Sequence, residues 1–461
     1  MTYADVIAAI STPPGKGGVA VIRISGAGAV AVGERVFFPS SGRSVREYSP
    51  RVQIYGYIKK GDETIDDGML TVFSSGASYT GEETVEISCH GGILITELVL
   101  SAVLSAGARA AMPGEFTRRA FLNGRISLSE AEAIGLLLDA RSEEQVHLSS
   151  KGSRDRLIAE IEGARESLTA LLGSVYARID YPDEDLGDFT DAEMLSVLRE
   201  VHSEVERLLS TYKTGHSIAE GVSTAIVGKP NVGKSSVYNL LCERDAAIVT
   251  DIEGTTRDVL EESVTLGGVM LRIADTAGIR SSTEDKIELI GIERSRERLR
   301  EAELLLAVFD ASLDDERDAA LIEELRKSDA VKIAIYNKVD KITAKRTETP
   351  LGIFDIAIEI SATERPNEAR AKITEAVRSL FIDEKISLSS DAVVSSARQR
   401  AELIQASEAI SSAISALGMG AMADAVSSDV EIALGALARI DGRAVSEAIV
   451  DNIFSRFCVG K

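Results

Sequence analysis

The segment Gly228-Lys229-Pro230-Asn231-Val232-Gly233-Lys234-Ser235 decides the fold of the centre of this chain. It fits the phosphate-loop pattern G-x-x-x-x-G-K-[ST]. The apolar, β-branched run at 222–227 reads as a buried strand before it, and 236–241 reads as a helix after it. Such a loop presents amide N–H groups and the positive end of a helix dipole to phosphate. We predict that Lys234 reaches the β- and γ-phosphates of a nucleotide and that Ser235 holds Mg²⁺.

Strands and helices alternate around this loop from about residue 218 to 384. This order predicts a Ras-like α/β domain, with a mostly parallel sheet and helices on both faces. The segment VTLGGV at 264–269 reads as a hairpin, so we expect one antiparallel pair. The predicted strands are 222–227, 260–266, 269–274, 304–309, 333–336 and 355–360.

Further short motifs follow in the order that a guanine-nucleotide switch requires. Thr256, in GTTRD at 254–258, can offer Mg²⁺ a second hydroxyl. Asp275, in DTAG, can hold Mg²⁺ through water, and the amide of Gly278 can contact the γ-phosphate. Asp340, in NKVD, can accept hydrogen bonds from N1–H and the exocyclic amine of guanine, which adenine does not present there. The backbone of 361–363 (SAT) can support the base.

The catalytic residues are less obvious from the motifs. Ile279 stands where Ras-type switches place the Gln that orients water, and Ile cannot do this. Asn231 offers a side-chain carbonyl that could coordinate a monovalent cation beside the phosphates. Glu288 is a candidate for positioning water, although a solvated helix carboxylate is the commoner role for such a residue. Arg257 and Arg280 remain candidate arginine fingers.

The flanking segments predict two further domains. Residues 1 to about 120 read as mixed α/β, with strands at 19–24, 52–58 and 84–89. The pattern is helical from about 127 and again after about 388, so one helical domain interrupted by the nucleotide domain is the simplest arrangement. The first helical face repeats at spacings of four and three: Leu157, Ile161, Ala164, Leu168, Leu171 and Val175. The predicted boundaries are 1–125, 126–217, 218–384 and 385–461.

Composition limits the functional class. The 461 residues carry 51 Lys and Arg against 73 Asp and Glu, a net charge of −22. So acidic a chain repels bulk nucleic acid unless a local patch or a partner supplies positive charge. Cys89, Cys242 and Cys458 show neither metal-site spacing nor a disulfide framework, which is typical of a reducing cytosol. No apolar run predicts a membrane span and no secretory signal is recognisable, so we expect a cytoplasmic protein.

Several segments outside the nucleotide motifs resemble the MnmE (TrmE) family of tRNA-modifying GTPases, of the TrmE-Era-like superfamily. The resemblance covers nearly the whole chain, and the matching segments at its two ends are more specific than the nucleotide motifs. They are PPGKGG at 13–18, RISG at 23–26, YTGE at 79–82, HGG at 90–92, PGEFT at 113–117, AFLNG at 120–124 and FCVGK at 457–461.

The resemblance implies two sets of site residues. The N-terminal domain is expected to form a homodimer and to bind 5-formyltetrahydrofolate through Arg23, Glu86, Arg125 and Lys461; Arg125 stands where relatives can carry Lys. Glu288 precedes LIG at 289–291, which matches the catalytic Glu of the family. The implied K⁺ ligands are Asn231, Thr250, Ile252 and Thr255. The full predicted nucleotide-binding set is Asn231, Val232, Gly233, Lys234, Ser235, Ser236, Thr250, Asp251, Ile252, Glu253, Gly254, Thr255, Thr256, Asp275, Thr276, Ala277, Gly278, Asn337, Lys338, Asp340, Ser361, Ala362 and Thr363.

The resemblance also implies partners. The family works with the flavoprotein MnmG, in a heterotetramer or larger complex, on the wobble uridine at position 34 of certain tRNAs. It uses a reduced-folate one-carbon unit to install aminomethyl or carboxymethylaminomethyl groups at carbon 5. Two alternatives remain at this point: a ribosome-assembly GTPase of the Era-like group and a folate-binding regulatory scaffold. The acidic balance argues against the first, and the intact Mg²⁺ and γ-phosphate residues argue against the second.

The C-terminal tail is expected to belong to the folate site. Cys458 is fourth from the end, but Gly460 and Lys461 fit a prenylation signal poorly. A frayed terminus is the common alternative. An apolar helical face formed by Ile449, Ile453, Phe454 and Phe457 should instead dock the tail. Gly460 would then permit a close approach, and Cys458 could serve as a nucleophile or an acid–base group.

Overall fold

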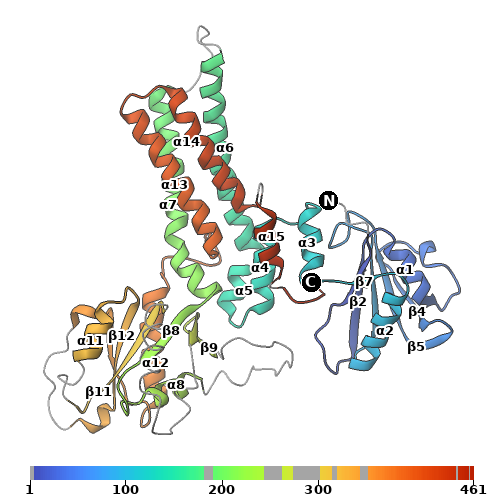
Figure 1. Cartoon of the computed structure of the whole chain (residues 1–461), viewed down its shortest axis with the longest axis horizontal. Coiled ribbons are helices and arrows are strands. Elements are labelled where there is room, and N and C mark those ends of the chain that lie inside the picture. The colour runs from blue at the N-terminus through green and yellow to red at the C-terminus, as the bar shows by residue number, and fades with distance from the viewer. Residues whose placement is uncertain are drawn as a thin grey trace. The chain divides into compact units, whose positions relative to one another are not determined.

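A computed structural model describes residues 5–180, 190–242, 262–273, 302–313, 319–342, 351–442, 445–455 and 457–460 (Figure 1). The chain divides into two compact units. One comprises Met1–Leu138 and Ala438–Lys461, and the other comprises Asp139–Leu437. None of the described helices combines the length and the apolar composition that crossing a membrane requires.

The first unit is built on a seven-stranded sheet with the order β3-β4-β5-β6-β2-β1-β7. Its pairs are antiparallel except for β1 with β7. One face buries Ile22, Ile24 and Ile87 against helices α1 and α2. The strands are β1 (Ile7–Ile10), β2 (Val19–Ser25), β3 (Phe37–Pro39), β4 (Gln53–Lys60), β5 (Glu63–Phe73), β6 (Thr84–His90) and β7 (Arg109–Ala110).

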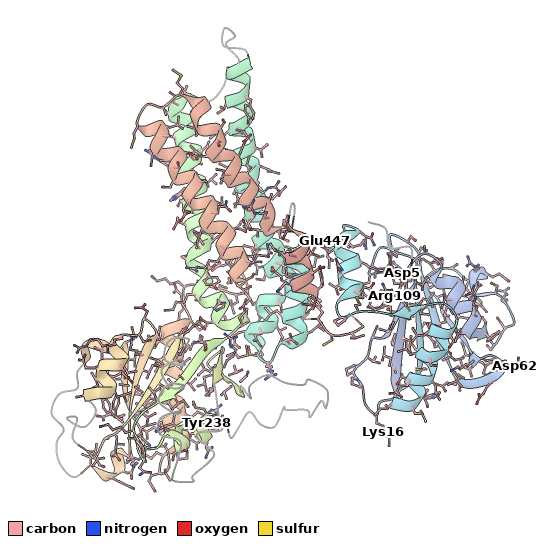
Figure 2. The ribbon with its side chains drawn as sticks, in the orientation of Figure 1. Asp5, Lys16, Asp62, Arg109, Tyr238 and Glu447 are labelled. Carbon is pink, nitrogen blue, oxygen red and sulfur yellow. The ribbon has the colours of Figure 1, made fainter. Side chains whose placement is uncertain are left out.

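Helix α3 is held to this unit by charge as well as by packing. Arg119 is fully buried on α3, and its Nη2 donates to Asp5 Oδ1 at 2.9 Å and to Glu115 Oε1 at 3.0 Å. Asp5 also accepts from Arg109, and both residues are labelled in Figure 2. The helices of this unit are α1 (Ala29–Val36), η1 (Val45–Glu47), α2 (Ile93–Ser105), α3 (Glu115–Leu122), α4 (Leu128–Asp139) and α15 (Glu447–Ser455).

The second unit contains a helical bundle whose two halves are far apart in sequence. Figure 1 shows α6, α7, α13 and α14 running alongside one another. All six residues of the predicted apolar face on α6 are buried. Ser407 on α13 bonds His202 on α7, with 3.2 Å between Oγ and Nε2, so the two predicted halves do pack together. The helices are α5 (Glu143–Ser149), α6 (Lys151–Asp180), α7 (Asp191–Ala219), α13 (Ala397–Gly418) and α14 (Ala423–Ile440).

The same unit contains the predicted nucleotide domain, a six-stranded sheet with the order β13-β12-β11-β8-β10-β9. Every pair is parallel except β9 with β10, which confirms the predicted hairpin. Helices α8 and α12 pack on one face and α11 on the other. The strands are β8 (Val222–Val227), β9 (Glu262–Leu266), β10 (Val269–Ile273), β11 (Leu304–Asp310), β12 (Val331–Asn337) and β13 (Ile356–Glu359). The helices are α8 (Lys234–Cys242), α11 (Ala319–Arg326), η4 (Val339–Lys341), η5 (Leu351–Ile353) and α12 (Pro366–Phe381).

Candidate functional site

The phosphate loop joins the carboxyl end of β8 to the N-terminus of α8, as the motif predicts. Asn231 has a left-handed backbone with φ of 66°, and Gly233 has φ of 102°. A Cβ atom at Gly233 would lie 2.2 Å from Asn337 Nδ2, so only glycine fits there. The loop is therefore shaped by contact with β12 as well as by its own residues.

Lys234 is folded back onto the loop. Its Nζ donates to the carbonyl oxygens of Gly228 and Lys229, both at 2.7 Å. Burial lowers the pKa of the Lys234 ammonium because it disfavours the charged form. A phosphate group would restore favourable charge around this ammonium. Ser235 follows at the start of α8 with an exposed side chain.

Asn337 connects the phosphate loop to the predicted base-binding segment. Its Nδ2 donates to the carbonyl oxygen of Val232 at 3.1 Å, and its Oδ1 accepts from the amide of Ala362 at 3.0 Å. The side chain is buried, so both bonds are shielded from water. The Asn337 side chain thus joins β12 to two other segments, at Val232 and Ala362, which are more than 100 positions apart in the sequence.

Asp340 lies in the short helix η4, directly after this connection. Ser361 donates its hydroxyl to Asp340 Oδ1 at 2.5 Å. This hydrogen bond is the largest cause of the lowered pKa of the Asp340 carboxyl. Asp340 is exposed, whereas Ser361 is buried. Thr363, two residues after Ser361, is also exposed. The ionised carboxylate of Asp340 is a hydrogen-bond acceptor, and its bond with Ser361 fixes its orientation.

Asp310 is a member of this site that sequence reasoning missed. It ends β11 directly opposite Asn337 in the β11–β12 ladder. Lys338 Nζ bonds Asp310 Oδ2 at 2.7 Å and also the carbonyl oxygen of Asn231. Burial raises the pKa of the Asp310 carboxyl, but bonds from Lys338 and Ser312 outweigh it, so the net pKa is lowered. The position of a carboxylate at the end of a buried parallel strand is typical of such sites, but its contact with Lys338 follows only from the strand pairing.

Many predicted site residues lie outside the described residues, so their roles remain predictions. They are Thr250, Asp251, Ile252, Glu253, Gly254, Thr255, Thr256, Arg257, Asp275, Thr276, Ala277, Gly278, Ile279, Arg280, Glu288 and Lys461.

In the N-terminal unit, Arg23 and Glu86 lie directly opposite each other on β2 and β6. Arg23 Nε donates to Glu86 Oε1 at 2.9 Å. The guanidinium carbon also lies 5.4 Å from the ring centroid of Tyr79 and 5.7 Å from that of Phe116. Both charged side chains keep some exposure, 16% for Arg23 and 27% for Glu86, so a ligand could reach them.

Arg125 lies beside the loop that carries Tyr79. A Cβ atom at Gly81 would lie 3.0 Å from Arg125 Cγ, and Asn123 Nδ2 donates to the carbonyl oxygen of Thr80 at 2.8 Å. Arg125 itself is exposed. The structure therefore joins Arg23 with Glu86 and places Arg125 along the adjoining loop.

The C-terminal tail docks against the same unit, as predicted. Phe454 is buried, and Ile449, Ile453 and Phe457 pack partly buried around it. Ser11 Oγ donates to the carbonyl oxygen of Gly460 at 3.1 Å. A Cβ atom at Gly460 would lie 2.2 Å from the carbonyl oxygen of Ile10. Within this docked tail the Cys458 residue is exposed.

A cavity of about 390 Å³ lies elsewhere, in the second unit, where α7, α12 and the β9–β10 turn meet. Thr214, Gly267 and Arg378 are among its lining residues, and none of the predicted site residues is. We therefore assign it no part in the nucleotide or folate chemistry.

Comparison with known proteins places these features in context. Residues 6–125 match the family model described as the GTP-binding protein TrmE N-terminus, and residues 128–458 match the MnmE helical domain. The chain is 39% identical to the tRNA modification GTPase MnmE of Clostridioides difficile, over 99% of both chains. It is 39% identical to that of Bacillus subtilis, over 99% of this chain and 100% of the relative, and 38% identical to that of Thermotoga petrophila with the same coverage.

Proposed function

The chain belongs to the MnmE family of tRNA modification GTPases, and from this membership we propose that it binds and hydrolyses GTP during tRNA modification. The observation that supports this most strongly is the Asn337 connection between the phosphate loop and the 361–363 segment. Beside it, Ser361 donates to Asp340, whose carboxylate would pair the two donors of guanine. Lys234 would exchange its two carbonyl partners for the β- and γ-phosphates.

The proposed metal sites use residues that precede, begin and follow α8 in the sequence. Ser235 and Thr256 would hold Mg²⁺, with Asp275 acting through water. Asn231, Thr250, Ile252 and Thr255 would hold K⁺. The side chains of Ser235 and Asn231 are exposed at the phosphate loop, which fits ligands that face a bound nucleotide. The ions supply positive charge at the phosphates, and Glu288 would position the attacking water in place of Ile279.

The N-terminal unit is proposed to bind 5-formyltetrahydrofolate. Glu86 offers acceptors for the donors of a pterin ring, and Arg23 with Arg125 offers positive charge to carboxylates. The aromatic rings of Tyr79 and Phe116 already flank the Arg23 guanidinium and could border a planar ligand. The docked tail would place Lys461 and Cys458 nearby.

The wider proposal concerns partners and product. A homodimer formed by the N-terminal domain would act with an MnmG-type flavoprotein on the wobble uridine at position 34, in the cytoplasm. The product would carry an aminomethyl or carboxymethylaminomethyl group at carbon 5. With a net charge of −22, the chain is expected to rely on its partner for much of the tRNA affinity. We assign residues 1–125 to the folate domain, 126–217 and 385–461 to the helical domain, and 218–384 to the GTPase domain.

Two measurements test this proposal. Nucleoside analysis of tRNA from cells lacking the chain should show loss of the carbon-5 modification, restored by the wild-type gene and not by the Glu288→Ala gene. GTP turnover by the purified chain should fall when Na⁺ replaces K⁺. A nucleoside profile that is the same in cells lacking the chain as in wild-type cells would refute the tRNA role. Turnover that is equal in the two salts would refute the K⁺ role while leaving the tRNA role intact.

A further inference from the structure

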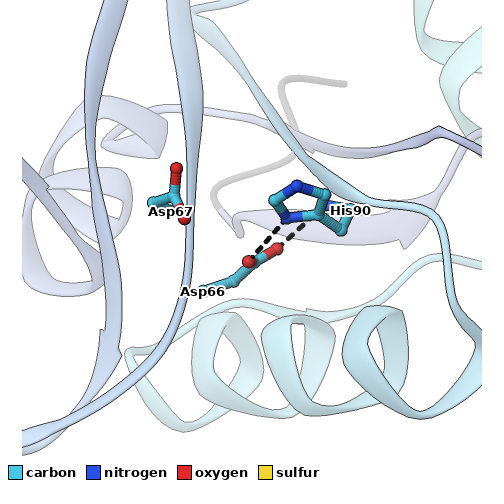
Figure 3. A group of neighbouring side chains, drawn as sticks. All are labelled: Asp66, Asp67 and His90. Carbon is cyan, nitrogen blue, oxygen red and sulfur yellow. Dashed lines mark hydrogen bonds and ion pairs between the residues drawn. The ribbon is translucent and has the colours of Figure 1, made fainter.

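Three potential metal ligands meet on the sheet of the N-terminal unit, away from the Arg23–Glu86 pair. Asp66 and Asp67 are consecutive on β5, and His90 ends β6 (Figure 3). One nitrogen and two carboxylate oxygens from these residues all lie within 4.8 Å of one another. His90 Nδ1 is 2.8 Å from Asp66 Oδ1.

Asp66 and Asp67 pair with the consecutive residues Ile58 and Tyr57 of β4, so this part of the ladder is regular. The irregularity of the β4–β5 ladder lies on the other side of Asp66. Ile58 pairs with Asp66 while the next residue, Lys59, pairs with Thr64, so the register shifts beside Asp66. An irregularity of this kind redirects side chains and is found next to functional positions. Here the shift passes over Ile65, next to Asp66, and one oxygen of each carboxylate lies within 4.8 Å of an imidazole nitrogen.

The surrounding contacts orient the potential ligands. The second oxygen of Asp66, Oδ2, accepts from the backbone amide of His90 at 2.8 Å. Tyr55 donates its hydroxyl to Asp67 Oδ2 at 3.1 Å. Such outer hydrogen bonds fix ligand orientation in metal sites. The Asp66 side chain is only 9% exposed, whereas that of His90 is 63% exposed, so an ion could enter from the His90 side.

Charge also favours a cation at this position. Two carboxylates face a single imidazole, which leaves an excess of negative charge even when the imidazole is protonated. The mixed nitrogen and oxygen donor set suits Zn²⁺ and its neighbours in the first transition row better than Mg²⁺ or Ca²⁺, which prefer oxygen alone. Three protein ligands leave a coordination position for water.

We propose that Asp66, Asp67 and His90 form a binding site for a divalent transition-metal ion of the Zn²⁺ class. The ion replaces any proton shared between His90 Nδ1 and Asp66 Oδ1, and it ties β5 to β6. None of these three residues belongs to the GTP or folate proposals, so the metal proposal stands or falls independently of them. The competing explanation is an ion pair between His90 and Asp66 with no metal.

Zn²⁺ itself is the probe. The full-length chain is stripped with a chelator, saturated with Mg²⁺ and GDP, and titrated with Zn²⁺ in competition with a chromophoric chelator. We expect one Zn²⁺ per chain at this site, and affinity at least about tenfold weaker in His90→Gln and Asp67→Asn, as for the loss of one ligand contact. His147→Gln, a change at an exposed histidine of α5, is the matched control and should bind as the wild type does. Zn²⁺ affinity unchanged in both His90→Gln and Asp67→Asn would mean that His90 and Asp66 form an ion pair and no metal site.

A second measurement keeps Asp66, Asp67 and His90 intact, so it does not depend on whether variants of these residues fold. The chain has four histidines, so ¹⁵N-histidine labelling gives four imidazole spin systems. One equivalent of Zn²⁺ should shift the His90 nitrogen resonances selectively, with His147→Gln and His202→Gln aiding the assignment. A shift confined to another histidine, or no shift at all, would overturn the proposal.

Discussion

Asn337 Nδ2 lies 3.1 Å from the carbonyl oxygen of Val232 and donates a hydrogen bond to it, which joins β12 to the phosphate loop. Replacing Asn337 by Ala leaves this carbonyl and the amide of Ala362 without their partner inside the protein. We expect a loss of about 2 kcal/mol or more in the free energy of unfolding, because buried unsatisfied groups keep their desolvation cost. Chemical denaturation of the nucleotide-free chain measures this loss.

The control for this prediction is Asn239→Ala on α8, where the side chain is exposed. That change should cost under about 0.5 kcal/mol, as most surface substitutions do. GTP affinity should fall in Asn337→Ala and stay unchanged in Asn239→Ala. Equal stability of the two variants would mean that the Val232 contact does not shape the phosphate loop.

Much of the nucleotide domain could be predicted because its strands are continuous apolar runs. The prediction at 222–227 matches β8, and 333–336 lies inside the longer β12, Val331–Asn337. Motif order grouped the phosphate loop with Asn337, Asp340 and Ser361, and hydrogen bonds join Asn337 to Val232 and Ser361 to Asp340. The role of Asp310 was missed because its contact with Lys338 depends on the pairing of β11 with β12, which no local pattern encodes.

The N-terminal unit was harder to predict for a physical reason. Strand β5 begins with Glu-Thr-Ile-Asp-Asp at 63–67, where Ile65 is the one apolar residue, and continues with Gly68, so it lacks the alternation seen in β6. Helix α3 buries Arg119, which a periodicity argument assigns to the surface. Its burial depends on Asp5 and Glu82, both distant in sequence. Long-range charge pairing is what single-sequence patterns do not report.

Asp340→Asn should change base selection. The amide would present a donor to a guanine N–H group where the carboxylate accepts, so GTP affinity should fall by about 10- to 100-fold, the value of a charge-assisted hydrogen bond. Xanthosine triphosphate should bind better than to the wild type. Fluorescent-nucleotide competition measures both affinities. Asp329→Asn, in the exposed turn before β12, is the matched control, and similar affinities for ATP and GTP in the wild type would contradict the role of Asp340.

Arg23→Gln should weaken the binding of 5-formyltetrahydrofolate. The substitution removes the charged partner of Glu86 and the cation beside Tyr79, so we expect a loss of about tenfold or more. Calorimetry with the full-length chain measures this, and GTP affinity should be unaffected. Arg43→Gln, at an exposed arginine of the same unit, is the control. Folate binding of equal strength in both variants would show that Arg23 is not part of the folate site.

His216 should make stability depend on pH. Its pKa is raised, first by the hydrogen bond with Glu303, whose oxygen lies 3.5 Å from Nε2, and further by Glu220; burial and Arg272 oppose this. A pKa above the unfolded value of about 6.5 stabilises the fold below that pH, and the contribution disappears as pH rises through the folded pKa. His216→Gln should therefore lower the Tm at about pH 5.5 and have little effect at about pH 8.5. A pH-independent effect of His216→Gln would reject the charge mechanism.

Substitutions at Cys458 and Gly460 distinguish a chemical role of the C-terminal tail from its docking on the N-terminal unit. Gly460 has φ of 99°, and an added Cβ would lie 2.2 Å from the carbonyl oxygen of Ile10, so Gly460→Ala should displace the tail from Ser11. Cys458→Ser keeps the backbone bond in which the amide of Gly114 donates to the carbonyl oxygen of residue 458, and it removes only an exposed thiol.

We expect both variants to hydrolyse GTP at nearly the wild-type rate and both to lose the wobble-uridine modification, measured by nucleoside analysis of cellular tRNA. Only Gly460→Ala should also weaken folate binding, because it alone moves Lys461. Normal modification in Cys458→Ser would show that the thiol takes no part in the chemistry, while normal folate binding in Gly460→Ala would exclude the docked tail from the folate site.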